Sequence, residues 1–181
     1  MKGLRIMVCH VAIVCATLMA PALSLAQQNI AYAAELATSP QLAGSSSAIV
    51  DGDIDTSASF EVGTEGEGAF TFTFDQPRQI EGLRFYQASD VYFTETWVVE
   101  VDQDGDGKFE AQIARGENAP LREWVQHTWE PMEITALRWR SVSGVSEGNR
   151  AHPSMAELQI FGQYRRTDME KAAAQGIPIA K

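Results

Sequence analysis

Residues 45–56, with the sequence SSSAIVDGDIDT, carry the clearest chemical pattern in the chain. Three carboxylates and a hydroxyl fall within six positions, at Asp51, Asp53, Asp55 and Thr56. Oxygen ligands at this density suit Ca²⁺, which takes about six to eight oxygens from carboxylates, carbonyls and water. Asp and Gly are also ordinary turn residues, and Gly52 gives a tight loop the backbone freedom that it needs. The residues alone therefore leave two interpretations open, a calcium loop and a solvent-exposed turn.

Residues 102–107, with the sequence DQDGDG, form a second acidic segment. Their spacing matches the first half of an EF-hand loop, with carboxylates at Asp102, Asp104 and Asp106. Glu110 falls at the ninth position of such a loop, but Ile113 stands where the bidentate glutamate belongs, and no helix-forming sequence flanks the segment. The sequence therefore favours an acidic hairpin tip with an Asp-Gly turn, and it predicts weak binding for any calcium ion held there.

Aromatic and polar side chains gather in two predicted loops, residues 88–95 and residues 143–154. The first loop carries Tyr92 and Phe93 near its middle. The second carries three hydrogen-bonding side chains within four positions, namely Asn149, Arg150 and His152. Aromatic rings at a loop tip can stack on a sugar while the polar groups bind its hydroxyls, or they can fold back over the end of a sheet. We predict that these five residues form a ligand site where the two loops meet.

Alternation of apolar and polar residues predicts an all-β protein. Phe70, Phe72 and Phe74 alternate with threonines, which is the pattern of a strand with one buried face. We expect these rings in the core, because each buried ring stabilises the fold by roughly 1.5–3 kcal/mol. Strands are predicted at residues 30–36, 69–75, 80–87, 96–101, 108–113, 124–129, 134–142 and 156–162. Turns with Gly, Pro or Asp separate most of them, so we expect an antiparallel β-sandwich.

The first 26 residues have the pattern of a secretory signal peptide. Lys2 and Arg5 form a basic start, and an apolar run follows at residues 6–20. Residues 24–26, SLA, place small side chains where a signal peptidase cleaves. The apolar run is short for a helix that spans a bilayer. We therefore expect an exported protein, periplasmic or extracellular, without a membrane span.

Beyond this leader we predict one domain, residues 27–163, followed by residues 164–181 as a short helix or flexible tail. Both cysteines, Cys9 and Cys15, lie in the leader, so no disulfide can form in the remainder. That remainder carries twelve basic and twenty-four acidic residues, a net charge of −12. A chain this acidic repels nucleic acid and anionic lipid, so a role in binding polyanions is not expected.

Two segments resemble motifs of discoidin-type domains. The run A-x-V-D-G-D-x-D-T at residues 48–56 resembles the A-V-D-G-D/N-x-x-T signature near the start of these domains. The segment AELQIFG at residues 156–162 resembles their S/A-E-[LIV]-x-[LIV]-[YF]-G ending. The group is also called galactose-binding-like, and it includes the coagulation factor V/VIII C-type domains and the family 32 carbohydrate-binding modules. The resemblance covers about residues 28–163.

This resemblance implies a β-sandwich jelly roll with a structural Ca²⁺ between its two matching ends. The ligands that it implies are Asp51, Asp53, Thr56 and Glu157, some of them through backbone carbonyls. It also implies a non-catalytic domain that binds carbohydrate, such as a cell-surface glycan.

Three hypotheses of function follow from the sequence. The first is a secreted carbohydrate-binding module with a structural calcium. The second is an exported, calcium-stabilised structural or adhesion protein that recognises a protein partner. The third and least favoured is an enzyme, because the predicted mature chain has no cysteine, no Gly-x-Ser-x-Gly elbow and no histidine pair at metal-binding spacing. We therefore expect no catalytic residues.

Overall fold

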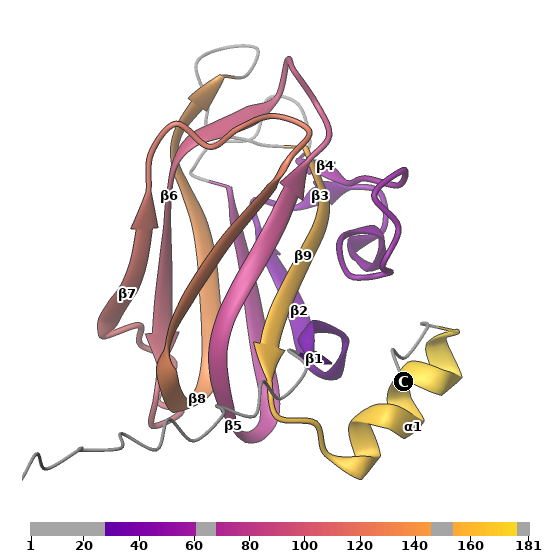
Figure 1. Ribbon diagram of the computed structural model, residues 1–181, viewed down its shortest axis with the longest axis vertical. Helices are drawn as coiled ribbons and strands as arrows, with labels where there is room; N and C mark the ends of the chain where they lie inside the picture. Colours follow the sequence, from indigo (N-terminus) through magenta and orange to yellow (C-terminus); the bar gives the residue numbers. More distant parts are fainter. Residues whose placement is uncertain (1–27, 61–67, 146–153, 177–181) are drawn as a thin grey trace, which may run out of the picture.

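The computed structural model describes residues 28–60, 68–145 and 154–176, and Figure 1 shows them as a β-sandwich with a helix near the C-terminus. In chain order the elements are β1 (Gln28–Asn29), η1 (Ala31–Ala33), β2 (Glu35–Ser39), β3 (Leu42–Ala43), η2 (Ser46–Ile49), β4 (Ser59–Phe60), β5 (Ala69–Gln87), β6 (Phe93–Asp102), β7 (Ala111–Gly116), β8 (Trp124–Val145), β9 (Met155–Gly162) and α1 (Arg166–Gln175). All strand pairs among these elements are antiparallel, which confirms the predicted fold class.

Strands β5 and β8 each run through both layers of the sandwich, and they bend from one layer to the other at the lower end in Figure 1. Residues 69–73 of β5 pair with residues 136–140 of β8, and residues 78–86 of β5 pair with residues 124–134 of β8. The register shifts between the two sets, which marks the corner. One layer, called here the β9 layer, has the order β1-β9-β5-β8, and the other, the β6 layer, has the order β2-β5-β8-β6-β7.

Aromatic rings fill the space between the two layers. Phe70, Phe72 and Phe74 are all buried, as their alternation with threonine predicts. Phe85 of the β9 layer makes edge contacts with Trp139 and Trp97 of the β6 layer, at centroid distances of 5.2 and 5.3 Å. Edge-to-face pairs of this kind add to the stabilisation from burial alone. The sandwich is therefore held by a shared aromatic core, with no cysteine among the described residues.

The strand predicted at residues 108–113 begins later, as β7 at Ala111. The carboxylate of Asp102 explains the difference, because it accepts hydrogen bonds from Gly105 N at 2.7 Å and Gly107 N at 2.9 Å. Lys108 N donates in turn to Asp106 Oδ1 at 2.8 Å. These backbone donors are therefore engaged by acidic side chains instead of a sheet ladder. The strand predicted at residues 30–36 is likewise replaced by η1 and the start of β2.

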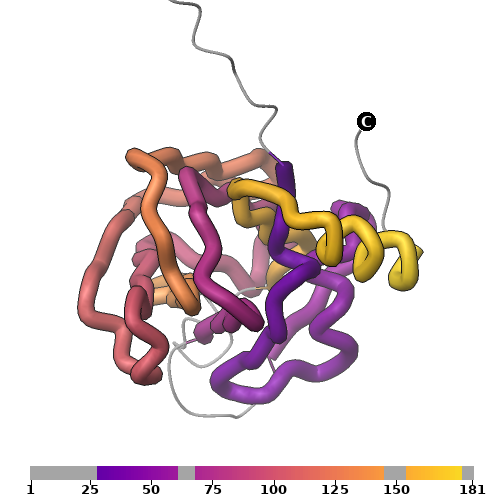
Figure 2. The backbone as a smooth tube through the Cα atoms, turned by 90° about the horizontal axis from the view of Figure 1, so that it is seen from below, coloured from indigo at the N-terminus to yellow at the C-terminus, as the bar shows by residue number. Residues whose placement is uncertain are grey.

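Helix α1 packs against the N-terminal segment beside the sandwich, as Figure 2 shows. Ala172 of the helix lies in a small apolar cluster with Tyr32 and Ala33. The first turn is anchored by Asp168, which is fully buried and forms an ion pair of 2.8 Å with the equally buried Arg78. The predicted alternatives of a short helix or a flexible tail therefore resolve into a docked helix for residues 166–175.

Within the described residues, no helix is long and apolar enough to cross a membrane.

Candidate functional site

The acidic loop after β3 is tied to the start of β9. Its base is closed by the pairing of β3 with β4. Ala58 and Met155 exchange two backbone hydrogen bonds of 2.9 and 3.0 Å, and Gly52 N donates to Glu157 Oε2 at 3.1 Å. Gly52 has φ of +84°, a left-handed conformation that glycine adopts without strain. The fold thus brings together the two segments on which the predicted calcium site depends.

Three acceptor oxygens converge on the hydroxyl of Thr56. Its Oγ1 lies 2.9 Å from Asp51 Oδ2, 3.0 Å from the Asp53 carbonyl oxygen and 3.3 Å from the Ala48 carbonyl oxygen. A hydroxyl has one proton, so Thr56 can donate to only one of these three at a time. The result is a group of hard oxygens with more acceptors than donors, which fits the donor set of a calcium ion.

Asp53 joins this group through its backbone and not through its carboxylate. Its Oδ1 accepts a hydrogen bond from Asp55 N at 2.9 Å, while its carbonyl oxygen faces Thr56. The Ala48 carbonyl, which the predicted ligand set does not include, occupies an equivalent position. A backbone carbonyl is available at every residue, so the sequence carries no signal that would have selected Ala48.

Glu157 is a fully buried carboxylate. Burial raises its pKa, with a smaller contribution from the negative charge of Asp51, to a net value of about 7. Hydrogen bonds from Gln159 and Gly52 and the positive charge of Arg84 act in the opposite direction, but they are outweighed. Two neighbouring carboxylates, one of them desolvated, favour a cation between them, because it would offset both the repulsion and the loss of water contacts.

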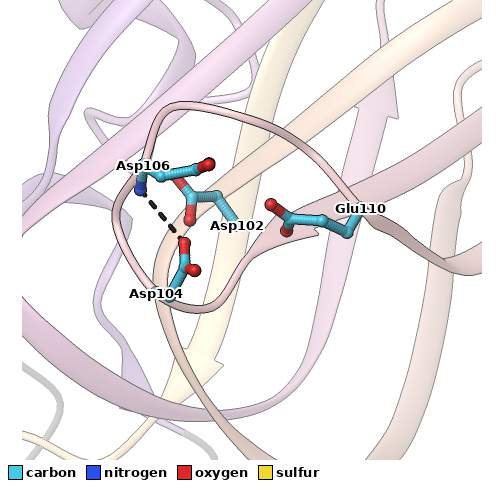
Figure 3. A group of neighbouring side chains, drawn as sticks. All are labelled: Asp102, Asp104, Asp106 and Glu110. Carbon is cyan, nitrogen blue, oxygen red and sulfur yellow. Dashed lines mark hydrogen bonds between the residues drawn. The ribbon is translucent and has the colours of Figure 1, made fainter.

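The second acidic loop also brings its carboxylates together (Figure 3). Asp102, Asp104, Asp106 and Glu110 each offer an oxygen, and these four atoms lie within 4.8 Å of one another. Glu110 takes a place in this group even though Ile113 occupies the usual position of the bidentate glutamate. The ammonium of Lys108, however, already contacts Asp106 Oδ2 and lowers the pKa of that carboxyl. A metal ion would therefore compete with Lys108, and weak calcium binding at this loop stays a prediction.

Tyr92 and Phe93 lie at the opposite end of the sandwich from the corner, and both are half-buried. Phe93 is the first residue of β6 and not part of the loop tip. The Tyr92 carbonyl accepts a hydrogen bond from Ser154 N at 2.8 Å. The other three predicted ligand residues, Asn149, Arg150 and His152, lie outside the described residues. The backbone contact nevertheless ties Tyr92 to Ser154, two positions after His152 in the sequence.

A buried amide fixes the base of the Tyr92 loop. Gln87 Oε1 accepts a hydrogen bond from Thr94 N at 2.6 Å, and Gln87 Nε2 donates to Thr94 O at 3.2 Å. The Thr94 hydroxyl lies 2.6 Å from Ser141 Oγ on β8. The loop of residues 88–93 therefore has both of its ends fixed, at Gln87 and Thr94, which limits the positions that Tyr92 can take.

One further cluster, on the outer face of the β9 layer, has no local signal in the sequence. The guanidinium of Arg84 lies 4.1 Å over the ring of Trp124, and this ring has an edge contact with Tyr86 at 5.5 Å. The alternation that places Leu83 and Phe85 in the core also directs Arg84 outward. The position of Trp124 beside it depends on the pairing of β5 with β8, which no local pattern specifies.

No family model and no curated protein sequence matches the chain. Its fold is the discoidin-type, galactose-binding-like β-sandwich, as the two sequence motifs imply, and solved carbohydrate-binding modules share it. One is the structure of two family 32 modules of ZmpB from Clostridium perfringens, with a TM-score of 0.63 and 13% identity, matching 76% of this chain and 36% of that chain. The chain thus spans about a third of the ZmpB structure.

Two further matches are single modules of nearly the same length as this sandwich. Chitosan-binding module 1 of the chitosanase/glucanase from Paenibacillus sp. IK-5 has a TM-score of 0.59 and 13% identity, over 74% of this chain and 98% of the module. The family 32 module of NanJ from C. perfringens, solved with galactose, has a TM-score of 0.58 and 14% identity, over 75% of this chain and 98% of the module. At these identities the likeness defines the fold.

Proposed function

We propose that this protein is an exported, non-catalytic carbohydrate-binding module that a calcium ion stabilises. The observation that carries the proposal is the hydrogen bond between Tyr92 and Ser154, because it joins the predicted loop 88–95 to the last residue of the predicted loop 143–154. The fold supports it, since nearly complete carbohydrate-binding modules superimpose on about three quarters of the chain.

The ligand in this proposal is a neutral sugar at the loop end of the sandwich. The ring of Tyr92 or Phe93 stacks on one face of the sugar, while Asn149, Arg150 and His152 bind its hydroxyls. Galactose is the first ligand to try, because the NanJ module was solved with galactose. Chitotriose, a basic amino sugar with which the second Paenibacillus chitosan-binding module was solved, is the comparison ligand. We expect modest affinity, since an open site buries little area and hydroxyls exchange their water contacts for similar ones.

The calcium ion in this proposal lies between the acidic loop and β9. Asp51, Thr56 and Glu157 would hold it through side chains, and Asp53 and Ala48 through carbonyl oxygens. The ion would supply the positive charge that the buried Glu157 lacks and would lock the loop against the sheet. Its role is therefore structural. The loop of Asp102, Asp104 and Asp106 stays a predicted second site of lower affinity.

Sugar binding can be tested with a double substitution at the loop end. We would titrate galactose and chitotriose into the wild type, into Tyr92→Ala/Phe93→Ala and into Phe109→Ala, and measure heats of binding. Phe109 is a matched aromatic control, because it lies under Arg138 on the far edge of the sandwich. Loss of binding in the double variant alone would support the loop site. Equal binding by all three proteins would place the site elsewhere.

The same proteins can be used to examine the alternative of a protein partner. Two results together would favour the adhesion hypothesis over the proposed function. The wild type would bind neither these sugars nor any glycan on an array, and an extract of cell-surface proteins would yield one partner whose capture needs Tyr92 and Phe93.

A further inference from the structure

Arg84 projects from the outer face of the β9 layer. It lies on β5 between Leu83 and Phe85, both fully buried, and it is directly opposite Gln159 of β9 in the sheet register. On its other side, β8 carries Trp124 beside Tyr86 in the same register. The group of Arg84, Tyr86, Trp124 and Gln159, called here the Arg84 face, therefore sits on strands of the sheet and not on the loops of the proposed sugar site.

The guanidinium of Arg84 is held in one orientation. Its Cζ lies over the Trp124 ring, 4.1 Å from the ring centre, and its Nε donates to Gln159 Oε1 at 2.8 Å. Phe161 lies on the same face, with its ring centre 5.7 Å from the guanidinium carbon. An arginine fixed through its ring contact and its Nε has already lost most of its rotamer freedom, so a ligand would not have to order it.

The two Nη atoms of Arg84 form no hydrogen bond or ion pair within the described residues. This is notable in a chain whose acids outnumber its bases by 24 to 14. Arg138 and Arg140, in comparable half-buried positions on the β6 layer, both bind Glu100. Burial also lowers the pKa of Arg84, which means that its positive charge is partly desolvated. Glu157, whose charge partly opposes this shift, directs its carboxylate to Gly52 and Gln159.

We propose that the Arg84 face is a second ligand site and that it takes a sugar bearing a carboxylate, such as a hexuronate residue. The paired Nη donors of a guanidinium match the two oxygens of a carboxylate in one plane. The half-exposed rings of Tyr86 and Trp124 lie beside those donors and offer an apolar surface to the carbon face of the sugar. The site would then require both a negative charge and an apolar ring face in one ligand, and a neutral sugar lacks the charge. The site is independent of the loop end.

The test uses two ligands with the same sugar backbone, trigalacturonate and its fully methyl-esterified form, in which methyl esters replace the charged carboxylates. We expect the wild type to bind the acid at least about tenfold more tightly than the ester, because a charge-assisted pair is worth about 1.5–3 kcal/mol. Arg84→Lys keeps the positive charge and removes the planar pair of donors. The affinity of this variant for the acid should therefore fall to near its affinity for the ester. Arg115→Lys, an exposed arginine on β7, is the matched control and should bind as the wild type does.

Trp124→Ala removes the ring over which Arg84 lies and should weaken trigalacturonate binding to a similar extent. The melting temperature of this variant is recorded to check that it folds. A wild type that binds acid and ester equally, or does not bind the acid up to about 10 mM, overturns the proposal. Unchanged acid binding by Arg84→Lys also overturns it. Tyr92→Ala/Phe93→Ala separates the two sites, since it should retain trigalacturonate binding while neutral-sugar binding is lost. If trigalacturonate binding is lost in that double variant and kept in Arg84→Lys, the acid binds at the loop end and the Arg84 proposal fails alone.

Discussion

The backbone N–H of Gly52 donates a hydrogen bond to the carboxylate of Glu157, across 105 residues of chain. This contact joins the acidic loop to the only acidic residue of β9, which is fully buried. A buried carboxylate with a raised pKa next to Asp51 is unfavourable unless a proton or a cation neutralises it. Calcium and pH should therefore both change the stability of the fold through Glu157.

Calcium should raise the melting temperature of the protein. Binding to the folded state alone stabilises it by RT ln(1 + [L]/Kd), about 2.7 kcal/mol at a hundredfold excess over Kd. Calorimetric melting with calcium and with a chelator measures the shift. Asp51→Ala should abolish it, whereas Asp104→Ala, in the second acidic loop, should keep most of it. A full calcium shift in Asp51→Ala would show that the stabilising ion binds somewhere else.

Without calcium, the protein should become less stable as the pH rises from 5.5 to 8. The pKa of Glu157 is about 7 in the folded protein against an ordinary value of 4.5, so the folded state binds this proton more tightly than the unfolded chain. The contribution of Glu157 protonation to the free energy of unfolding is full below pH 4.5 and is lost as the pH passes through 7. It amounts to at most about 3 kcal/mol. Urea unfolding in the presence of a chelator measures it.

Glu157→Gln is the control for this pH dependence. The amide keeps the shape of the side chain and cannot titrate, so the difference in unfolding free energy between pH 5.5 and 8 should shrink. The calcium shift should also be larger at pH 8 than at pH 5.5 in the wild type, because the ion must displace the proton. An identical pH dependence in both proteins would mean that Glu157 titrates near its ordinary value.

Arg78→Ala should destabilise the protein by about 3–5 kcal/mol, because it leaves Asp168 charged and buried without its partner. The loss should be accompanied by release of α1, which amide hydrogen exchange over residues 166–175 would detect. Arg166→Ala is the matched control. Its exposed pair with Glu170 is worth at most about 0.5 kcal/mol, so both stability and protection should stay near those of the wild type.

Gln87→Ala should loosen the loop end of the sandwich. It leaves both backbone groups of Thr94 without their side-chain partner in a buried place, at a cost of about 1–3 kcal/mol for each unsatisfied group. Affinity for a neutral sugar should fall together with stability. Gln112→Ala, at an exposed position of β7, should change neither quantity. Normal sugar affinity in Gln87→Ala would mean that the loop does not depend on this anchor.

The parts of the fold that the sequence predicts are those with a local period. Phe70, Phe72 and Phe74 could be assigned to the core because strand side chains alternate between two faces. Glu157 could be paired with the acidic loop because both ends match one family of motifs. The later start of β7 could not be predicted, since it depends on which backbone donors the Asp102 carboxylate captures.

The Arg84 face marks a second limit of sequence analysis. Trp124 follows Arg84 by forty positions, and the two side chains meet only because β5 and β8 pair in one particular register. A lone arginine in an alternating strand looks like a solvent-exposed charge. Only the cross-strand arrangement distinguishes it from Arg138, which has a carboxylate partner.

The chain enters and leaves the sandwich at the same end. Gln28 of β1 is paired with Gly162 of β9, close to the corner where β5 and β8 change layers, whereas β6 and β9 begin at the far end (Figure 1). A molecule attached to a support through the paired ends of β1 and β9 would have its loop end turned away from the support. An array of molecules held at this end would present many loop ends toward a glycan-coated surface at once.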